Sequence, residues 1–325
     1  SNETSASTFS PYRHGGYSTY FGGFGDGINL NGDAEFAFGT NDFTVEFWIY
    51  PLTRTATEAQ LVDFRGSSGN GAYTLLYLDN QYNTNDIIYY HQGGARITSS
   101  AIPDNAWSHV ALTRSGNDVK LFVNGQKEGS TFTNSLTQLV GTDGPRFGSY
   151  HNTAYALTGY MSDIRILNGT AAYTSNFTPP TEPLTAITNT KFLLGNLPYL
   201  KDQSASNHTI TVGGNVSLKP KSLFDNAAYS EADHGASAKI ESSGSNRLTS
   251  PITAMGTGDF TVSGWVYTIG SNSSDIIFDT RPIASDASTG FYLAQYNAGY
   301  FYVGTANNNF GPIQGTTNYP KNAWN

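Results

Sequence analysis

Apolar and polar residues alternate in short segments along most of the chain. In the segment DFTVEFWIY (42–50), every second residue is large and apolar, namely Phe43, Val45, Phe47 and Ile49. A period of two places these side chains on one face of a strand and predicts that the strand is half buried. No segment shows a convincing helical period over ten residues, so the pattern predicts an all-β protein.

Turn-forming residues separate these segments and predict how neighbouring strands connect. HVALTR and VKLFVNGQKEG are expected to form two strands joined by SGND. Asn124-Gly125 predicts a tight hairpin, because both residues tolerate a positive φ. A further alternating strand is expected in GYMSDIRILNG (159–169). Strands of this kind predict an antiparallel β-sandwich.

Part of this pattern occurs twice. GTNDFTVEFWIY (39–50) returns as GTGDFTVSGWVY (256–267), and Trp107 returns as Trp324, both at an offset of 217 residues. Between these anchors LVDFRG corresponds to IIFDTRP with a slip of one residue. The shared offset predicts a tandem duplication of one β-sandwich unit. The recurrence of the tryptophans favours a packing role for them over a role in choosing a ligand.

Three segments carry a resemblance to a known family. DFTVEFWIY, NAWSHVALTRSGNDVKLFVNGQKEG and GYMSDIRILNGTAAYTSNFTPPTEPL resemble laminin-G-like, concanavalin A-like jelly-roll modules, most closely those of marine bacteriophage virion structural and fibre proteins. The resemblance implies two antiparallel sheets packed face to face, often with a concave sheet and loops that bind sugars, sometimes with Ca²⁺. Because a fold does not fix a function, the site has to be argued from the residues.

The same alignment suggests domain limits. We expect a first laminin-G-like sandwich over 1–186, with 1–16 as an N-terminal linker, and a second over 187–325 that is truncated at its C-terminus. The proline-rich segment TSNFTPPTEPLTAITNT should run extended across the surface. In an alternative arrangement, KFLLGN closes the first module as a permuted first strand. The chain is expected to be a piece of a longer one, unless a neighbouring chain completes the second module.

Composition and charge exclude several classes of function. The chain has 325 residues, no cysteine, 13% charged residues and a formal net charge of −8. Scattered basic residues and this negative charge argue against nucleic-acid binding. No cysteine is available for a disulfide or a thiolate metal site. No apolar run reaches the length that a membrane span requires.

Motifs for catalysis are missing from the sequence, so we expect no enzyme. The glucanases of this superfamily carry two glutamates flanking an aspartate on one strand, and no such run occurs here. The six histidines show no metal-ligand spacing, and His109 is expected to be a packed or hydrogen-bonded sheet residue. GGFGDG (22–27) resembles a phosphate loop, but neither a lysine nor a helix follows, so a glycine-rich hairpin is expected.

Calcium is the one cofactor that the chain could hold. The candidate ligands are the carboxylates of Asp26, Asp79 and Asp143. Each of them also suits a turn, where aspartate bonds to its own backbone, and the turn interpretation is favoured. We therefore expect no obligatory cofactor.

Carbohydrate binding is the sharper hypothesis. Sugar sites pair an aromatic platform with planar polar side chains, because sugar rings have apolar C–H faces and a fringe of hydroxyls. Two predicted loops are rich in both residue types, in 78–96 and 148–159. Their candidate residues are Tyr82, Asn83, Tyr90, His91, Arg96, Tyr150, His151 and Tyr155. The alternative is that these side chains face the core or another subunit.

A structural role in a virion is the rival interpretation, and the two are compatible. Low charge and tandem modules suit a tail fibre, a capsid fibre or a capsid decoration protein, oligomeric and acting through avidity. The partners would be other virion proteins, identical subunits and host-surface glycans, and the location would be the virion surface. The alternatives are a secreted or surface-bound bacterial adhesin or carbohydrate-binding module and, less favoured, a glycoside hydrolase.

Overall fold

The computed structural model describes most of the chain and divides it into two compact units. It describes residues 4–7, 16–52, 58–66, 69–79, 85–150, 155–221, 223–224, 237–240, 260–269, 274–281, 290–296, 299–305, 313–315, 319 and 323–325. The first unit comprises Arg13–Ala228, and the second comprises Ser1–Tyr12 with Tyr229–Asn325. Each unit is described by itself.

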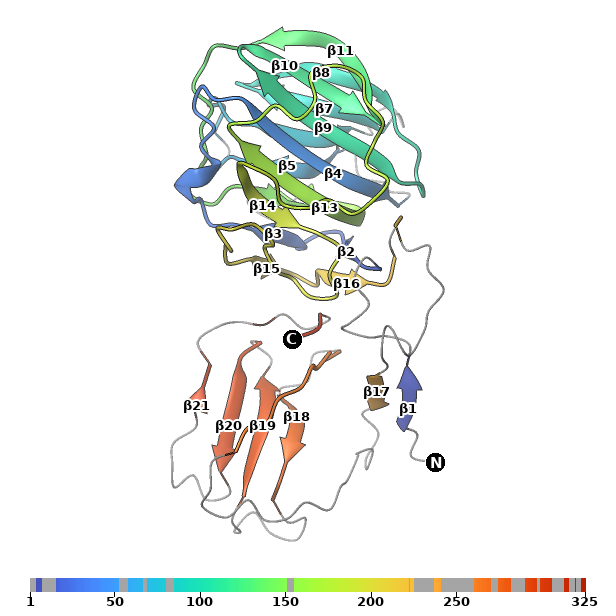
Figure 1. The fold of residues 1–325 in the computed structure, drawn as a ribbon, viewed down its shortest axis with the longest axis vertical. Coiled ribbons are helices and arrows are strands. Elements are labelled where there is room, and N and C mark those ends of the chain that lie inside the picture. Colours follow the sequence, from blue (N-terminus) through green and yellow to red (C-terminus); the bar gives the residue numbers. More distant parts are fainter. Residues whose placement is uncertain are drawn as a thin grey trace. The chain divides into compact units, whose positions relative to one another are not determined.

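One layer of the first unit is an eight-stranded antiparallel sheet (Figure 1). Its strands follow the order β11-β10-β9-β4-β13-β2-β16, and β14 also pairs with β13. The members are β2 (Ser18–Gly22), β4 (Phe43–Pro51), β9 (Ser108–Ser115), β10 (Asp118–Val123), β11 (Gln126–Thr133), β13 (Thr158–Asn168), β14 (Thr190–Leu194) and β16 (Ser217–Lys219). The expected hairpin joins β10 to β11, with Asn124 and Gly125 at φ 49° and 76°.

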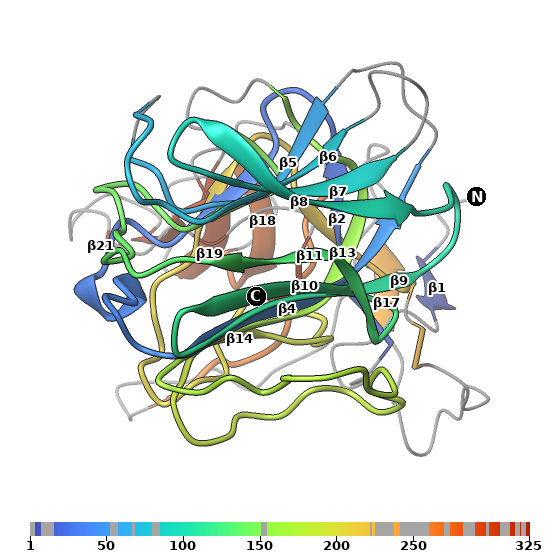
Figure 2. The same cartoon turned by 90° about the horizontal axis from the view of Figure 1, so that it is seen from above.

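The second layer is a seven-stranded sheet in the order β15-β3-β12-β5-β6-β7-β8. The members are β3 (Gly27–Asn29), β5 (Glu58–Asp63), β6 (Leu75–Asp79), β7 (Asp86–His91), β8 (Gly94–Ala101), β12 (Arg146–Phe147) and β15 (Thr211–Gly213). Figure 2 shows β5 to β8 as a layer facing β4, β9 and β10. One short 3₁₀ helix, η1 (Ala34–Phe36), precedes β4.

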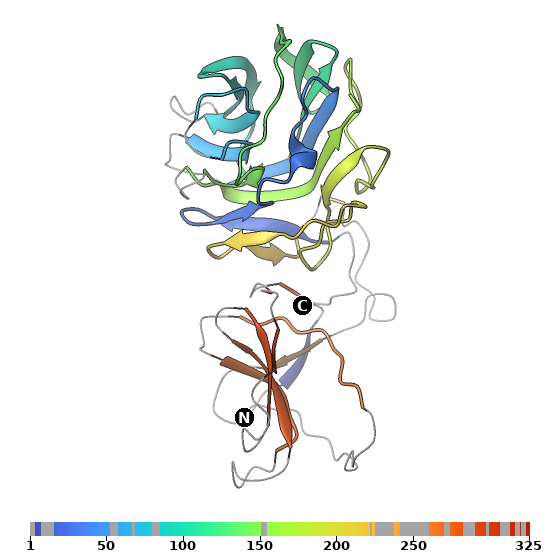
Figure 3. The ribbon, with the colours of Figure 1, turned by 90° about the vertical axis from the view of Figure 1, so that its left-hand side faces the viewer.

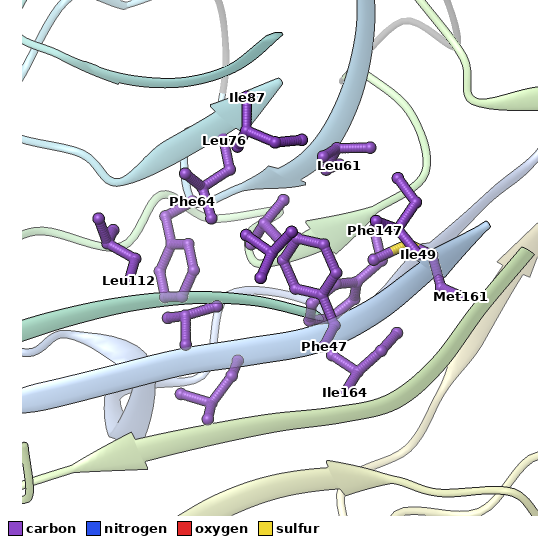
Figure 4. Packing of buried hydrophobic residues seen from close by; sticks show 14 of the residues in the cluster. Phe47, Ile49, Leu61, Phe64, Leu76, Ile87, Leu112, Phe147, Met161 and Ile164 are labelled. Atoms are coloured by element: carbon purple, nitrogen blue, oxygen red, sulfur yellow. The ribbon is translucent and has the colours of Figure 1, made fainter. Parts of the chain in front are cut away.

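The core lies between the two layers (Figure 4). The apolar face of β4 supplies Phe43, Val45, Phe47 and Ile49, all fully buried, as the alternation predicts. They pack in one cluster with apolar residues of the other sheet, among them Leu61, Leu76, Ile87 and Phe147. Each such side chain contributes about 1.5–3 kcal/mol through burial, so this cluster is the main source of stability.

Part of the opposite face of the eight-stranded sheet is also covered, by residues 169–189, which we call the covering segment (Figure 2). Tyr173 donates a hydrogen bond from its hydroxyl to Glu46 at 2.8 Å and accepts one at its carbonyl from Thr113, also at 2.8 Å. Phe177 stacks on Tyr173, with 3.6 Å between ring centroids. The proline-rich segment therefore crosses the sheet as expected, and it buries the polar face of β4.

A buried ion pair lies beneath this segment. One carboxylate oxygen of Glu46 accepts two hydrogen bonds from the Arg165 guanidinium, at 2.9 and 2.6 Å, and the other lies 3.3 Å from His109 Nε2. Burial alone would raise the pKa of Glu46, but hydrogen bonding to His109 and the charge of Arg165 outweigh it and lower that pKa. His109 is thus a packed, paired sheet residue, as the sequence indicates.

The first three strands after residue 187 belong to the first unit. β14 pairs with β13, β15 with β3, and β16 with β2. Figure 3 shows the yellow strands β15 and β16 beside the blue strands β2 and β3. The observed division differs from the boundary expected between 186 and 187, and the alternative in which KFLLGN closes the first module describes the pairing. The expected linker over 1–16 differs too, because β1 (Thr4–Ser7) pairs with β17 (Ser237–Ile240) in the second unit.

The second unit repeats part of the first. Its main sheet has the order β18-β19-β20-β21, comprising β18 (Ser274–Asp279), β19 (Phe291–Tyr296), β20 (Phe301–Thr305) and β21 (Ile313–Gln314). The corresponding strands of the first unit are β5 to β8, in the same antiparallel order. The all-β sandwich class, with part of the sandwich repeated in the second unit, is therefore confirmed. Among the described residues, no helix has the length and apolar character needed to cross a membrane.

Candidate functional site

Polar and aromatic side chains gather on the outer face of the seven-stranded sheet. In β6, Leu76 and Leu78 belong to the core, so Tyr77 between them points to the outer face. Tyr77 lies opposite Gln60 of β5, and its ring centroid is 6.3 Å from that of Tyr90 in β7. Both tyrosines are partly exposed. Alternation along three adjacent strands thus builds this part of the surface.

Arg65 connects this face to the loop that follows β12. Its Nε and Nη2 donate to the two carboxylate oxygens of Asp63, each at 2.9 Å. The fixed guanidinium lies over the ring of Tyr150, 4.9 Å from its centroid. Tyr150 in turn meets Tyr155 edge to face at 6.0 Å. The forked ion pair and the stacking leave little freedom to either ring.

Tyr155 is held in an unusual conformation. Its φ is 50°, in the left-handed region that bulky residues seldom adopt, and its carbonyl accepts a hydrogen bond from Gln60 N at 2.7 Å. The side chain is 50% exposed. Backbone strain of this kind costs on the order of 1 kcal/mol and persists only where the surroundings determine the geometry. The hydrogen bond from β5 therefore helps to hold the exposed ring of Tyr155 in place.

Gln60 adds an unsatisfied polar group beneath these rings. The residue is only 4% exposed, and its Oε1 has no hydrogen-bond partner among the described residues. A buried amide oxygen without a partner costs free energy, about 1–3 kcal/mol. We call Tyr77, Tyr90, Tyr150, Tyr155 and Arg65 the tyrosine surface.

Carboxylates border the tyrosine surface. Glu58 of β5 lies opposite Asp79 of β6, which lies opposite Asp86 of β7. Burial and the neighbouring charge of Asp79 raise the pKa of Glu58. Burial, followed by the charges of Glu58 and Asp79, raises the pKa of Tyr77 to about 12, so its hydroxyl remains a donor at neutral pH. For Arg65, hydrogen bonding to Asp63 outweighs burial and raises the pKa, so the charge is secure.

This arrangement offers two kinds of chemistry. Aromatic rings with hydroxyl, guanidinium and amide groups around them suit the C–H faces and hydroxyls of sugars. A carboxyl with a raised pKa opposite a second carboxyl group suits acid–base work on a glycosidic bond. The two functions share one surface, and an experiment has to separate them.

The structure brings together three of the predicted sugar-binding residues, Tyr90, Tyr150 and Tyr155. His91 is fully buried and lies on the other side of β7. Burial, and then the charge of Arg96, lower the pKa of His91 to about 4, so the imidazole is neutral and can accept from the Gln138 amide at 3.1 Å. His91 is therefore a core residue that no surface ligand can contact.

The remaining predicted residues lie elsewhere. Arg96 is at the β7–β8 hairpin, where its Nε donates to the carbonyl of His91 at 3.0 Å and its guanidinium lies over the ring of Phe132. Tyr82, Asn83 and His151 fall outside the described residues.

Sequence reasoning missed Arg65, Tyr77 and Gln60. A signal for Tyr77 existed, since LLYLD alternates like a strand with its tyrosine on the polar face. The Asp-x-Arg spacing of Asp63 and Arg65 was a signal for a local ion pair. Nothing in the sequence indicated that Gln60 would lack a partner, because that depends on the packing around it.

The three predicted calcium ligands lie on different loops and strand ends. Both carboxylate oxygens of Asp26 accept backbone amides, from Gly22 and Asn215, each at 2.6 Å. Asp143 pairs with Arg146 at 3.1 Å. Asp79 ends β6. The part of the chain that the structure describes contains no cluster of three or more histidine, aspartate or glutamate residues suited to a metal ion.

Asp26 instead fixes the glycine-rich turn. GGFGDG connects β2 of one sheet to β3 of the other, so it is a crossover between the layers rather than the expected hairpin within one sheet. A Cβ at Gly214 would lie 2.3 Å from an Asp26 oxygen, which explains the glycine there. Asp26 thus acts through the turn, as the favoured interpretation held.

The fold and these residues fit one family, and a sequence comparison decides it. The model of the concanavalin A-like lectin/glucanases superfamily, of the laminin G type, matches residues 21–196. The chain belongs to this superfamily. The match includes β14, which agrees with its pairing to β13.

Solved structures with some likeness to this superfamily member differ widely in sequence. A protein from Bacteroides ovatus described as carbohydrate-binding is 15% identical, with 65% of this chain and 62% of that one covered and a TM-score of 0.45. The chain therefore spans less than two thirds of that protein. A heptameric SAP-like pentraxin from Limulus polyphemus is 12% identical over 66% of this chain and 99% of its own, with a TM-score of 0.43.

A third structure is the CBM40 module of a Ruminococcus gnavus sialidase bound to α2,6-sialyllactose. It is 18% identical, with 45% of this chain and 89% of that chain covered and a TM-score of 0.36. A comparison with curated protein sequences gave no match.

Proposed function

We propose that this lectin-like chain binds carbohydrate without chemical turnover, through the tyrosine surface. The observation that carries the proposal is the pair Tyr150 and Tyr155, fixed by the Arg65 guanidinium and by the strained backbone of Tyr155. Fixed aromatic rings lose little conformational entropy on binding, so stacking on a sugar contributes to affinity directly. Gln60 of β5 supports the site through its backbone, because its N donates to the carbonyl of Tyr155 at 2.7 Å.

The proposal extends to the setting of this surface. We place the chain on the outside of a phage particle, in a tail fibre, a capsid fibre or a decoration protein, where virion proteins or identical subunits are its neighbours and host glycans its ligand. The resemblance of the sequence motifs to phage modules supports this. The repetition of one module along the chain supports avidity as the route to tight attachment. Antibody labelling of purified particles would test it, and labelling of a bacterial cell surface instead would favour an adhesin.

The binding test uses the full chain on a glycan array. Tyr155→Asn removes the exposed ring, while asparagine tolerates the left-handed backbone, so strain does not confound the result. We expect loss of the bound glycans, by tenfold or more in affinity, with an unchanged melting temperature. Phe24→Ala is the matched control, because Phe24 is 86% exposed on the β2–β3 turn. Equal binding by wild type and Tyr155→Asn, or equal loss with Phe24→Ala, would contradict the proposal.

A second candidate, glycoside hydrolysis, is favoured by one observation, the raised pKa of Glu58 opposite Asp79. Directly opposite residues have Cβ atoms about 4.5–5.5 Å apart, which brings two carboxylates within reach of one glycosidic bond. We expect a glycan identified on the array to be recovered intact after prolonged incubation. Cleavage that Glu58→Gln abolishes would replace the binding proposal with a hydrolase.

A further inference from the structure

A row of aromatic side chains crosses the outer face of the other sheet of the first unit. Tyr20 of β2, Tyr160 of β13 and Tyr50 of β4 are direct partners in the strand register. Trp107, just before β9, continues the row. All four side chains are partly exposed. The row thus spans β2, β13 and β4 in register and reaches the start of β9.

The rings lie close together and tilt against one another. Centroids are separated by 5.0 Å between Tyr20 and Tyr160, 5.8 Å between Tyr160 and Tyr50, and 5.4 Å between Tyr50 and Trp107. The interplanar angles are 50°, 84° and 63°. These spacings are close to the length of one pyranose unit. The tilts exclude a flat platform for a crystalline polysaccharide face and suit one flexible chain.

Two lysines lie over this row. The Nζ of Lys221 is 4.0 Å from the ring centroid of Tyr50 and 5.4 Å from that of Tyr160. The Nζ of Lys219 is 5.9 Å from the ring centroid of Tyr20. Among the described residues, neither ammonium group forms an ion pair with a carboxylate. Lys191, Arg65 and Arg165, by contrast, each form one. The row therefore carries positive charge that the described chain leaves unmatched, although the protein as a whole is acidic.

We propose that this row binds a linear acidic polysaccharide, such as a chain of uronic acids. Successive sugar rings would lie against Tyr20, Tyr160, Tyr50 and Trp107, while carboxylate groups pair with Lys219 and Lys221. The lysines then exchange a ring face for a carboxylate, and the exposed tyrosine faces become available to C–H groups. The site is on the sheet opposite to the tyrosine surface, so it does not depend on the proposed function.

Charge separates this ligand from the other occupants. A neutral glycan would leave both ammonium groups without an anionic partner, and two lysines are too few for a nucleic acid, whose phosphates need many cations. A second copy of the chain is the remaining occupant of an aromatic face. Binding of an acidic polysaccharide predicts retardation by that polysaccharide, whereas pairing with a second copy predicts a concentration-dependent dimer.

The experiment measures binding of the full chain to polygalacturonate, with neutral dextran for comparison, by affinity electrophoresis at two salt concentrations. We expect retardation by polygalacturonate only, weakened by salt. The double variant Lys219→Gln, Lys221→Gln should weaken binding roughly tenfold and remove most of the salt dependence. The double variant with arginine at both positions should bind as the wild type does.

Controls separate this proposal from the one above. Lys201→Gln removes an exposed charge elsewhere on the same unit, and Tyr155→Asn disables the tyrosine surface; both should retain polygalacturonate binding. Absence of retardation, equal loss with Lys201→Gln, or retention in the double glutamine variant would each overturn the proposal. So would a concentration-dependent dimer, seen by sedimentation, that the double glutamine variant abolishes.

Discussion

The two units of the chain contain the same hairpin, down to its irregularity. In the first unit the pairing of β5 with β6 shifts register between Gln60 and Val62. In the second unit the pairing of β18 with β19 shifts between Ile276 and Phe278, so Leu61 and Ile277 are the extra residues. When LVDFRG and IIFDTRP are aligned with the one-residue slip, these two extra residues correspond to each other. The duplication seen in the sequence is therefore a duplication of structure.

The correspondence extends to the neighbouring strands. Ile49 lies opposite Ser108 in the first unit, and Val266 exchanges backbone hydrogen bonds with Asn325 at 3.0 and 2.9 Å in the second. The edge-to-face contact of Tyr50 with Trp107 recurs between Tyr267 and Trp324 at 5.7 Å. Register and aromatic pairing are thus set by sequence that both copies share.

Burial is where the units differ. Phe43 and Val45 are fully buried, whereas their counterparts Phe260 and Val262 are 55% and 41% exposed. The alternation is the same in both copies, but Phe43 and Val45 lie in a strand of the eight-stranded sheet. Among the described residues, 260–269 belong to no sheet, and Phe260 only stacks on Phe291 of β19 at 5.1 Å. Local sequence therefore sets strand register, while burial depends on strands that come from distant parts of the chain.

The largest expected effect is on stability, at the corresponding positions 43 and 260 of the two units. Phe43→Ala removes a fully buried ring that stacks on Phe38 at 4.2 Å, and we expect it to destabilise the first unit by about 3–5 kcal/mol. Phe260→Ala should cost the second unit roughly 1 kcal/mol, because its ring is more than half exposed. Hydrogen exchange measured by mass spectrometry on peptides from each unit reports the two effects separately.

The control for this pair of substitutions is hydrogen exchange in the unit that does not carry the substitution. Phe43→Ala should leave exchange in 291–296 unchanged, and Phe260→Ala should leave exchange in 43–51 unchanged. Equal costs for the two substitutions would show that the second unit buries Phe260 in solution, and the contrast drawn from burial would be wrong.

The sequence predicted the elements of the first unit well for a local reason. Alternation identified β4 and its core face, and Asn124-Gly125 identified the β10–β11 turn, since both signals reside in consecutive residues. The same logic placed the polar face of β4 in solvent. The structure buries it, because Glu46 pairs with Arg165 and receives Tyr173 from the covering segment, more than a hundred residues away.

The candidate site was predicted in part for a related reason. Tyr150 and Tyr155 were identified as exposed loop residues, and both are at the surface. His91 was assigned to the same surface from composition alone, although strand alternation places it on the core side of β7, next to Gln138. The partners of Tyr150, above all Arg65, come from another strand, and a single sequence carries no signal for that contact.

A smaller effect concerns a buried carboxyl group of the first unit. Asp163 accepts hydrogen bonds from Ser162 and from Leu184 N, and burial raises its pKa from 3.8 to about 6. Between those values the folded state holds a proton that the unfolded chain releases, so this group stabilises the fold below pH 4 and loses that contribution as pH rises through 6. From pH 4 to pH 7, we expect wild type to lose on the order of 2 kcal/mol relative to Asp163→Asn.

Calorimetric melting of the full chain measures this difference. The transition of the first unit is identified as the one that Phe43→Ala lowers, and Asp163→Asn should raise it relative to wild type only as pH increases. Asparagine suits the site because residue 163 has a φ of 50°. Glu182→Gln, which alters an exposed carboxyl of the covering segment, should show no such trend. A pH-independent difference for Asp163→Asn would mean that Asp163 titrates normally.

The smallest expected effect on stability concerns an aspartate–arginine ion pair that both units contain. Arg281 binds the two oxygens of Asp279 at 2.9 and 2.7 Å, as Arg65 binds Asp63. The side chain of Asp63 is 1% exposed and that of Asp279 is 33% exposed. Asp63→Asn should therefore cost about 1–2 kcal/mol, because the Arg65 charge loses its partner in a desolvated site. Asp279→Asn should cost at most about 0.5 kcal/mol, since solvent screens the pair.

Salt separates these two substitutions further. Screening weakens an exposed ion pair and leaves a buried one largely intact, so the cost of Asp279→Asn should vanish in 1 M salt while that of Asp63→Asn persists. Denaturant melts of each variant, read by hydrogen exchange within β6 and β19, give both values. If the two costs were equal and equally sensitive to salt, the ion pair would stabilise only the local hairpin in each unit. Arg281 also lies over a tyrosine ring, that of Tyr292, at 4.2 Å. A larger cost in the first unit would therefore come from the burial of Asp63, which holds the guanidinium beneath the Tyr150 ring.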